Sequence, residues 1–301
     1  LHRFESQQNG IREGRMKTGV SLFSFTEDAD LDDIFGKIRA AGYDGAEPVM
    51  SENGYLNPCT TAAQIKEIKN LADSHGLEIP SVGVWALWEN NLVSNDAGIA
   101  KRALDIVKKQ IEAAHLLGAD TILVVPGYVG CDFASKPERV RYDLAYDRCR
   151  RALEILSKEA EKAKVNIGIE NVWNRFLLSP LEVKRLLEEV GSPNVGVYFD
   201  VGNIMYLGYP GDWIEILGDH IKKIHLSDYR TSQAGLGAFV DLFAGDVDFH
   251  EVAHALHKIG YDDYVILEML PNYKQFPEVS IVSNKTAVDK IVELINLSGR
   301  Q

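Results

Sequence analysis

Cysteine is scarce in this sequence. The chain has three cysteines, Cys59, Cys131 and Cys149, and no CxxC pair. A disulfide framework needs more cysteines at regular spacings, and structural zinc sites use closely paired ones. Neither can be the basis of this fold, and a reducing cytoplasm is the expected compartment.

Long apolar runs are missing as well. No stretch approaches the roughly 18 consecutive apolar residues of a membrane helix, and the first residues lack the apolar core of a signal peptide. We therefore expect no membrane partner. Residues 1–15 are polar and precede the first apolar run. We assign residues 1–16 to a leader or extension that can be disordered, and residues 17–301 to one folded domain.

Positive charge is in deficit. The chain has 32 Lys and Arg residues against 44 Asp and Glu residues, which gives a formal net charge of −12. Nucleic acids are held mainly by clustered Lys and Arg side chains. We therefore do not expect nucleic acid as a partner.

A glycine-rich dinucleotide turn is also absent. The segment SLFSFTEDAD, residues 21–30, follows the first expected strand and contains no glycine. An open, doubly wound sheet that binds a dinucleotide normally carries glycines at this turn. This fold is therefore the less favoured alternative, and hydride transfer to a nucleotide is not indicated.

Short β-rich runs alternate eight times with longer amphipathic runs. One example is DTILVVP, residues 120–126, which precedes a helical pattern at about 136–164. Strands rich in Val, Ile and Leu that are each followed by a helix are typical of a parallel sheet covered by helices. Eight such units in one chain predict the α/β class, as a single (β/α)8 TIM barrel.

Four of the expected strands end in residues that commonly bind metals: Glu170, Asp200, His225 and Glu268. In a TIM barrel, the C-terminal strand ends face the active-site mouth. Three carboxylates and one imidazole that converge there would be unfavourable without a cation. We therefore predict one divalent metal ion. The oxygen-rich set favours Mn²⁺, Mg²⁺ or Co²⁺, with Zn²⁺ as the alternative. Ordinary strand-end polar residues that face loops or solvent are the competing interpretation.

The segment HEVAH, residues 250–254, matches the H-E-x-x-H pattern of zinc proteases. His250 and His254 would share one face of a helix. However, this helix follows the seventh expected strand, so in a barrel it belongs to the outer ring, away from the mouth. We predict that HEVAH is not a metal site.

Five segments in the second half of the chain carry a family resemblance: GIENVWNRF (168–176), YFDVGN (198–203), KIHLSDYR (223–230), AGDVDF (244–249) and VILEM (265–269). With these motifs in this order, the chain resembles the xylose isomerase-like TIM-barrel superfamily of sugar isomerases and epimerases, particularly the D-tagatose and D-psicose 3-epimerase branch. Each motif is weak alone, and the ordered set is specific. The resemblance runs from about residue 17 to residue 297.

The resemblance implies a metal-dependent isomerase or epimerase that acts on a small ketose or keto-sugar. Glu170 and Glu268 would then be both metal ligands and catalytic groups, acting as base and acid on opposite faces of an enediolate. Asp200 and His225 would serve as metal ligands only.

The resemblance also indicates residues that could bind the substrate. Arg230 would orient a substrate oxygen, and Asn203 stands where many relatives carry histidine. Glu47 and Trp88 would line the pocket, with loop packing as the competing interpretation for both.

Three other functions remain open. A lyase with the same metal site, similar to an inosose dehydratase or an enzyme that cleaves oxidised C-glycosides, could be signalled by Asn203 and the long loop 127–140. A zinc abasic-site endonuclease would need more histidine ligands, and a catalytically silent sugar-binding protein would need no acid and base. The sugar, its phosphorylation, the metal and the oligomeric state (a homodimer or homotetramer are the assemblies considered) stay undetermined.

Overall fold

The computed structural model describes residues 16–26, 29–132, 134, 137–270 and 273–298. Residues 1–15 of the expected leader lie outside the described residues. Met16, which the sequence analysis placed with that leader, is buried in the core.

One parallel sheet forms the centre of the molecule. Its strands are β1 (Thr18–Ser21), β2 (Gly45–Glu47), β3 (Val49–Met50), β4 (Ser81–Val84), β5 (Thr121–Val124), β6 (Asn166–Glu170), β7 (Val195–Asp200), β8 (Ile221–Leu226) and β11 (Val265–Leu267). Their order in the sheet is β2-β1-β11-β8-β7-β6-β5-β4-β3. Every neighbouring pair in this order is parallel.

The two ends of that order are consecutive in the chain. β2 pairs with β1 and β3 pairs with β4, and only Pro48 separates β2 from β3. Proline has no N–H to donate, so it interrupts a strand without changing the strand's course. β2 and β3 therefore act as one barrel strand, and the sheet closes on itself. The predicted (β/α)8 TIM barrel is confirmed.

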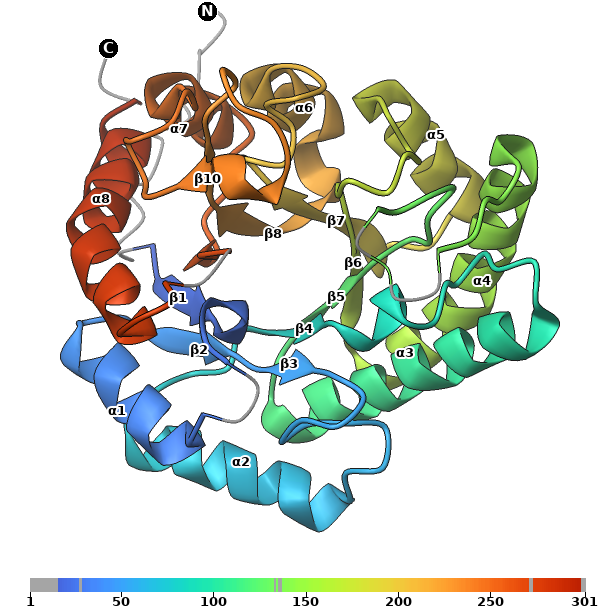
Figure 1. Ribbon diagram of the computed structural model, residues 1–301, viewed down its shortest axis with the longest axis horizontal. Coiled ribbons are helices and arrows are strands. Elements are labelled where there is room, and N and C mark those ends of the chain that lie inside the picture. Colours follow the sequence, from blue (N-terminus) through green and yellow to red (C-terminus); the bar gives the residue numbers. More distant parts are fainter. Residues whose placement is uncertain (1–15, 27–28, 133, 135–136, 271–272, 299–301) are drawn as a thin grey trace, which may run out of the picture.

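In the described part of the chain, eight α-helices surround this sheet in chain order (Figure 1). They are α1 (Leu31–Ala40), α2 (Ala62–Ser74), α3 (Ala97–Leu117), α4 (Tyr142–Ala163), α5 (Pro180–Val190), α6 (Pro210–Leu217), α7 (Phe249–Lys258) and α8 (Pro277–Leu297). Within the described ranges, none of these helices is long and apolar enough to cross a membrane. A small antiparallel hairpin of β9 (Asp228–Tyr229) and β10 (Phe239–Val240) lies after β8.

Local sequence signals fix where several helices begin and end. Thr61 and Gln64 form a reciprocal capping box at the start of α2, and Asp96 caps the first N–H groups of α3. Gly118 ends α3 in the left-handed conformation that glycine adopts without steric cost. Such caps satisfy backbone groups that have no partner within the helix.

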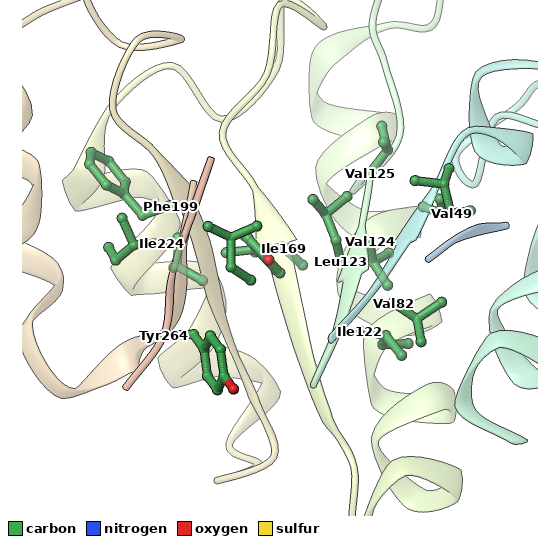
Figure 2. Packing of buried hydrophobic residues seen from close by; sticks show 14 of the residues in the cluster. Val49, Val82, Ile122, Leu123, Val124, Val125, Ile169, Phe199, Ile224 and Tyr264 are labelled. Carbon is green, nitrogen blue, oxygen red and sulfur yellow. The ribbon is translucent and has the colours of Figure 1, made fainter. Parts of the chain in front are cut away.

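The main apolar core lies between the sheet and the helices. Phe199 of β7 packs against Trp213 of α6, with ring centroids 6.3 Å apart. Figure 2 shows the corresponding packing of Ile122, Val124 and Ile169 on β5 and β6. Alternate side chains of each strand point the other way, into the barrel. The residues at those inward positions determine the chemistry of the interior.

Candidate metal centre

Four adjacent strands bring the predicted ligands together. Glu170 ends β6, Asp200 ends β7, His225 is the last residue but one of β8, and Glu268 directly follows β11. One donor atom from each side chain lies within 4.8 Å of the donor atoms of the other three. Ligands on opposite sides of one ion, at about 2.0–2.6 Å each, would be about 4–5 Å apart. The cluster therefore has the dimensions of a site for a single cation.

Two donor atoms in this cluster have no hydrogen-bond partner among the described groups. They are Asp200 Oδ2 and His225 Nδ1, and both are buried. The other polar atom of each side chain, Asp200 Oδ1 or His225 Nε2, does have hydrogen-bond partners. Asp200 Oδ1 accepts hydrogen bonds of 2.7 Å from Ser227 Oγ and 2.7 Å from the backbone N–H of Asn203. Buried polar atoms normally have partners, so these residues fit a divalent cation.

The electrostatics of the cluster agree with this interpretation. Burial, together with the charge of Glu268, raises the pKa of Glu170 well above its usual range. The same two causes raise the pKa of Asp200 to about 7. Burial and mutual repulsion favour protonated carboxyl groups here, and the positive charge of His225 offsets this only in part. A bound divalent cation would supply further positive charge.

A second polar layer lies beneath His225. The imidazole Nε2 donates to Glu47 Oε1 at 2.9 Å, and Glu47 Oε2 accepts from Ser81 Oγ at 2.6 Å and from the hydroxyl of Tyr198. Glu47 and Tyr198 belong to β2 and β7, which are not neighbours in the sheet, so this contact crosses the barrel interior.

Glu47 therefore lies elsewhere than expected. Its side chain is fully buried behind His225 and does not line the cavity above the acidic cluster. Burial alone would raise the pKa of Glu47, but the charge and hydrogen bond of His225 outweigh it, so the pKa is lowered. An ionised carboxylate on Nε2 fixes the tautomer that leaves Nδ1 free to coordinate a metal.

Ser81 and Tyr198 were not among the residues predicted from the sequence. Both are polar side chains at inward positions of otherwise apolar strands, and Tyr198 precedes Asp200 by two residues. Side chains two apart on a strand share a face. That spacing was the available sign that Tyr198 points into the same interior as Asp200.

A cavity of about 150 Å³ lies against the acidic cluster and includes Glu170 and Glu268 in its wall. Trp88 and Asn203 line this cavity. Arg230 does not, because its guanidinium donates to the carbonyl of Ala244 at 2.8 Å.

Most of the cavity wall is apolar, and the sequence analysis did not identify its aromatic part. Trp173 packs on Phe239 of β10 with ring centroids 5.4 Å apart, and its indole N–H donates to the carbonyl of Asn203 at 3.1 Å. Both rings line the cavity. Trp173 lies in the irregular segment after β6, so periodicity could not locate it. Its position three residues after Glu170 was the only sequence sign.

The HEVAH segment lies on α7, in the outer ring of helices, as predicted from its place in the chain. His250 and His254 are exposed on that helix, and Glu251 packs over Gly211 of α6. Among the residues that the structure describes, only the cluster at the barrel mouth groups three or more potential ligands closely enough for one ion.

Comparisons with known proteins agree with this architecture. Residues 35–287 match the family model described as Xylose isomerase-like TIM barrel. The putative L-ribulose-5-phosphate 3-epimerase SgbU of Escherichia coli (strain K12) is 27% identical over 235 residues, which cover 76% of this chain and 79% of that protein. The inosose dehydratase of Geobacillus thermodenitrificans (strain NG80-2) is 25% identical over 293 residues, which cover 86% of this chain and 91% of that protein.

Solved structures show the same fold. The structure of L-ribulose 3-epimerase matches with a TM-score of 0.78 and 18% identity, over 95% of this chain and 97% of that one. At this identity the match shows the fold alone. The family model, in contrast, spans most of the chain and confirms the resemblance carried by the strand-end motifs. The chain therefore belongs to the xylose isomerase-like TIM barrel family.

Proposed function

We propose that this protein is a metal-dependent sugar epimerase or isomerase that transfers a proton at the carbon next to the carbonyl group of a ketose or keto-sugar. One observation carries the proposal. The carboxylates of Glu170 and Glu268 line a cavity, and the buried atoms His225 Nδ1 and Asp200 Oδ2 of the same cluster have no hydrogen-bond partner among the described groups. Acid and base groups thus accompany a set of free metal ligands.

Glu170, Asp200, His225 and Glu268 would hold the metal. Their oxygen-rich donor set favours Mn²⁺, Mg²⁺ or Co²⁺, with Zn²⁺ as the alternative. When bound, such an ion polarises a carbonyl oxygen and stabilises the negative charge that develops on it. Asn203 N–H and Ser227 Oγ hold the other oxygen of Asp200, so this ligand is oriented before any ion binds.

The chain's own part in the reaction is to move protons. One of Glu170 and Glu268 accepts the proton from the substrate carbon, and the other donates a proton to the opposite face of the enediolate. One C–H bond breaks and one forms, so the composition of the sugar does not change. Return of the proton to the opposite face of the same carbon inverts the configuration of that carbon. The two carboxyl groups exchange roles in the reverse direction.

The cavity walls would position the substrate. Trp88 and Asn203 line the cavity and would face a bound sugar. Glu47 would act through its contact with His225. Arg230 could reach a substrate oxygen only by leaving the carbonyl of Ala244. We therefore propose Trp88 and Asn203 as substrate-binding residues and Glu47 as a positioning residue.

A lyase is the second candidate, supported by the similarity to an inosose dehydratase. The same base would remove the same type of proton, but a β-substituent would then leave. An abasic-site endonuclease has less support, since the ligand cluster contains one histidine and the net charge is −12. A silent sugar-binding protein would not need two carboxylates in its cavity.

The test is solvent exchange by metal-loaded protein in deuterated water. Ketoses, ketose phosphates, keto-inositols and keto-glycosides would be incubated separately, and deuterium at the carbon next to the carbonyl measured by NMR. We expect one class to gain deuterium and yield its epimer or isomer. Glu170→Gln and Glu268→Gln should each suppress exchange by at least about a hundredfold, because an amide cannot accept the proton.

Glu215→Gln is the matched control. Glu215 is exposed on α6 and pairs with Lys258, so this variant should keep full exchange. An unsaturated product with loss of water or a substituent would identify the lyase instead. Full activity in both Glu170→Gln and Glu268→Gln would reject the two-carboxylate mechanism.

A further inference from the structure

A second cavity, of about 440 Å³, adjoins the cavity over the acidic cluster. Phe23, Trp85 and Leu270 form part of the wall of both. The two cavities therefore lie on either side of the same three side chains. The second cavity is about three times larger than the first, so a molecule bound over the acidic cluster has room to extend into it.

Neither cavity has a cationic side chain in the described part of its wall. Among the described residues that line them, none is Lys or Arg. A phosphate monoester is usually held by Arg, by Lys or by N–H groups at a helix N-terminus. Arg230, the basic residue expected near the substrate, is bonded to the carbonyl of Ala244 outside both walls. The charge distribution therefore disfavours a sugar phosphate.

The second cavity also offers few partners for sugar hydroxyl groups. Its walls include the apolar residues Leu22, Phe25 and Val49. Of its polar residues, Ser51 Oγ accepts from the N–H of Gly54 at 2.9 Å and the hydroxyl of Tyr55 accepts from the N–H of Val49 at 3.0 Å, so each is already engaged on one side. A buried hydroxyl without a partner is costly, so this cavity suits an apolar group better than more of a sugar.

Aromatic side chains form the boundary between the two cavities. The rings of Phe23 and Trp85 lie 6.0 Å apart and are tilted by 59°. Such tilted faces can contact a further ring edge-on or face-on. Trp85 keeps 36% of its surface exposed, so its ring is available to a ligand.

We propose that the second cavity is a subsite for an apolar, ring-sized substituent, and that the substrate is an unphosphorylated keto-glycoside with an aromatic aglycone. This inference rests on the proposed function, which places the reacting carbon at Glu170 and Glu268. A glycosidic bond occupies the anomeric carbon. The carbonyl group next to the reacting carbon must therefore lie elsewhere on the sugar ring.

The test compares two ligands on the metal-loaded full chain. Methyl and phenyl 3-keto-β-D-glucopyranoside differ only in the aglycone, and their dissociation constants would be measured by calorimetry. Burial of a phenyl ring should tighten binding by at least about tenfold. Trp85→Ala should remove most of this preference. Tyr209→Ala, which removes an exposed aromatic side chain outside both cavities, should retain it.

A second variant covers the case in which Trp85→Ala does not fold. Thr26 is an exposed residue of the second cavity, and Thr26→Arg would add a charge to its wall. The phenyl preference should then fall severalfold, with little change for the methyl glycoside. Equal binding of both glycosides by the natural protein, or tighter binding of a ketose phosphate than of its unphosphorylated form, would overturn the inference.

The same ligands separate this inference from the proposed function. Deuterium uptake by the methyl and phenyl keto-glycosides without any phenyl preference would leave the proton-transfer function intact and reject the subsite. A phenyl preference that disappears in Trp85→Ala, without deuterium uptake by any compound, would support the subsite and reject the function.

Discussion

Glu47 Oε1 and His225 Nε2 lie 2.9 Å apart across the interior of the barrel, between side chains with no exposed surface. The contact joins β2 to β8, and it leaves His225 Nδ1 as the nitrogen that faces Glu170 and Glu268. A carboxylate behind a histidine orients the ring and increases the basicity of its other nitrogen. In the proposed metal site, Glu47 is therefore the residue that positions His225.

The first prediction concerns this contact. Glu47→Ala should weaken Mn²⁺ binding by about 10- to 100-fold, because His225 loses the partner that fixes its tautomer. Glu47→Gln should have a smaller effect, since its amide oxygen can still accept the N–H of His225. Mn²⁺ titration followed by calorimetry would measure both, with Glu215→Gln as the control. An unchanged Mn²⁺ affinity in a folded Glu47→Ala protein would contradict the role of Glu47.

A second prediction separates the two histidine-bearing segments. His225→Ala should greatly reduce the metal content, because it removes a buried donor atom from the cluster. His250→Ala and His254→Ala change exposed side chains on the outer helix α7 and should leave the metal content unchanged. Elemental analysis after dialysis against Mn²⁺ would measure all three. Loss of metal in His254→Ala would show that HEVAH does bind an ion.

A third prediction concerns Gly168, which faces Tyr198 inside the barrel. A Cβ atom at Gly168 would lie 2.9 Å from Tyr198 Cβ and 3.0 Å from its backbone nitrogen. Gly168→Ala should therefore destabilise the fold by about 1–3 kcal/mol, the usual cost of overpacking. It should also weaken Mn²⁺ binding, because Tyr198 supports Glu47.

Gly237→Ala provides the comparison for Gly168→Ala, since no atom of the described residues lies within 4 Å of a Cβ atom at Gly237. Urea unfolding curves of the two variants would measure the difference. Equal stability of both variants would mean that the strands around Gly168 can separate without cost.

Much of the fold, and the convergence of Glu170, Asp200, His225 and Glu268, could be predicted from local patterns. Apolar runs that end in Glu170, Asp200 or His225 identify strands and their polar ends together, because the C-terminal ends of parallel strands meet at one face of a barrel. The HEVAH segment could be placed in the outer ring for the same reason. These inferences need only the alternation of strands and helices.

Contacts across the barrel could not be predicted in this way. Glu47 was expected to line the pocket, because its position near a strand end does not reveal how deep it lies. Its true partners, Tyr198 and His225, come from the other side of the closed sheet. Trp173 and Arg230 lie outside the regular strands, where side-chain direction depends on neighbouring loops. No periodic pattern encodes those directions.

The last prediction is the pH dependence of the metal-free protein. The pKa of Asp200 is raised to about 7, and the pKa of His225 is also raised. A group with a raised pKa stabilises the fold below its unfolded-state pKa, and this contribution is lost as the pH rises through the folded-state value. For Asp200 the loss should occur between about pH 4 and pH 7. The lowered pKa of Glu47 acts in the opposite sense, and its contribution is complete once the pH exceeds the ordinary glutamate value of about 4.5.

Thermal unfolding with a chelator should therefore show a falling melting temperature from about pH 5 to pH 8. The increase in melting temperature on adding Mn²⁺ should grow over the same interval, because fewer protons compete for the carboxylates. Asp200→Asn removes the titrating group, so the metal-free variant should show a shallower decline. A melting temperature of the metal-free protein that rises with pH, or an unchanged decline in Asp200→Asn, would contradict this account. Glu170, whose pKa is also raised, would be the next residue to replace, because its burial and its closeness to Glu268 give it the same direction of effect.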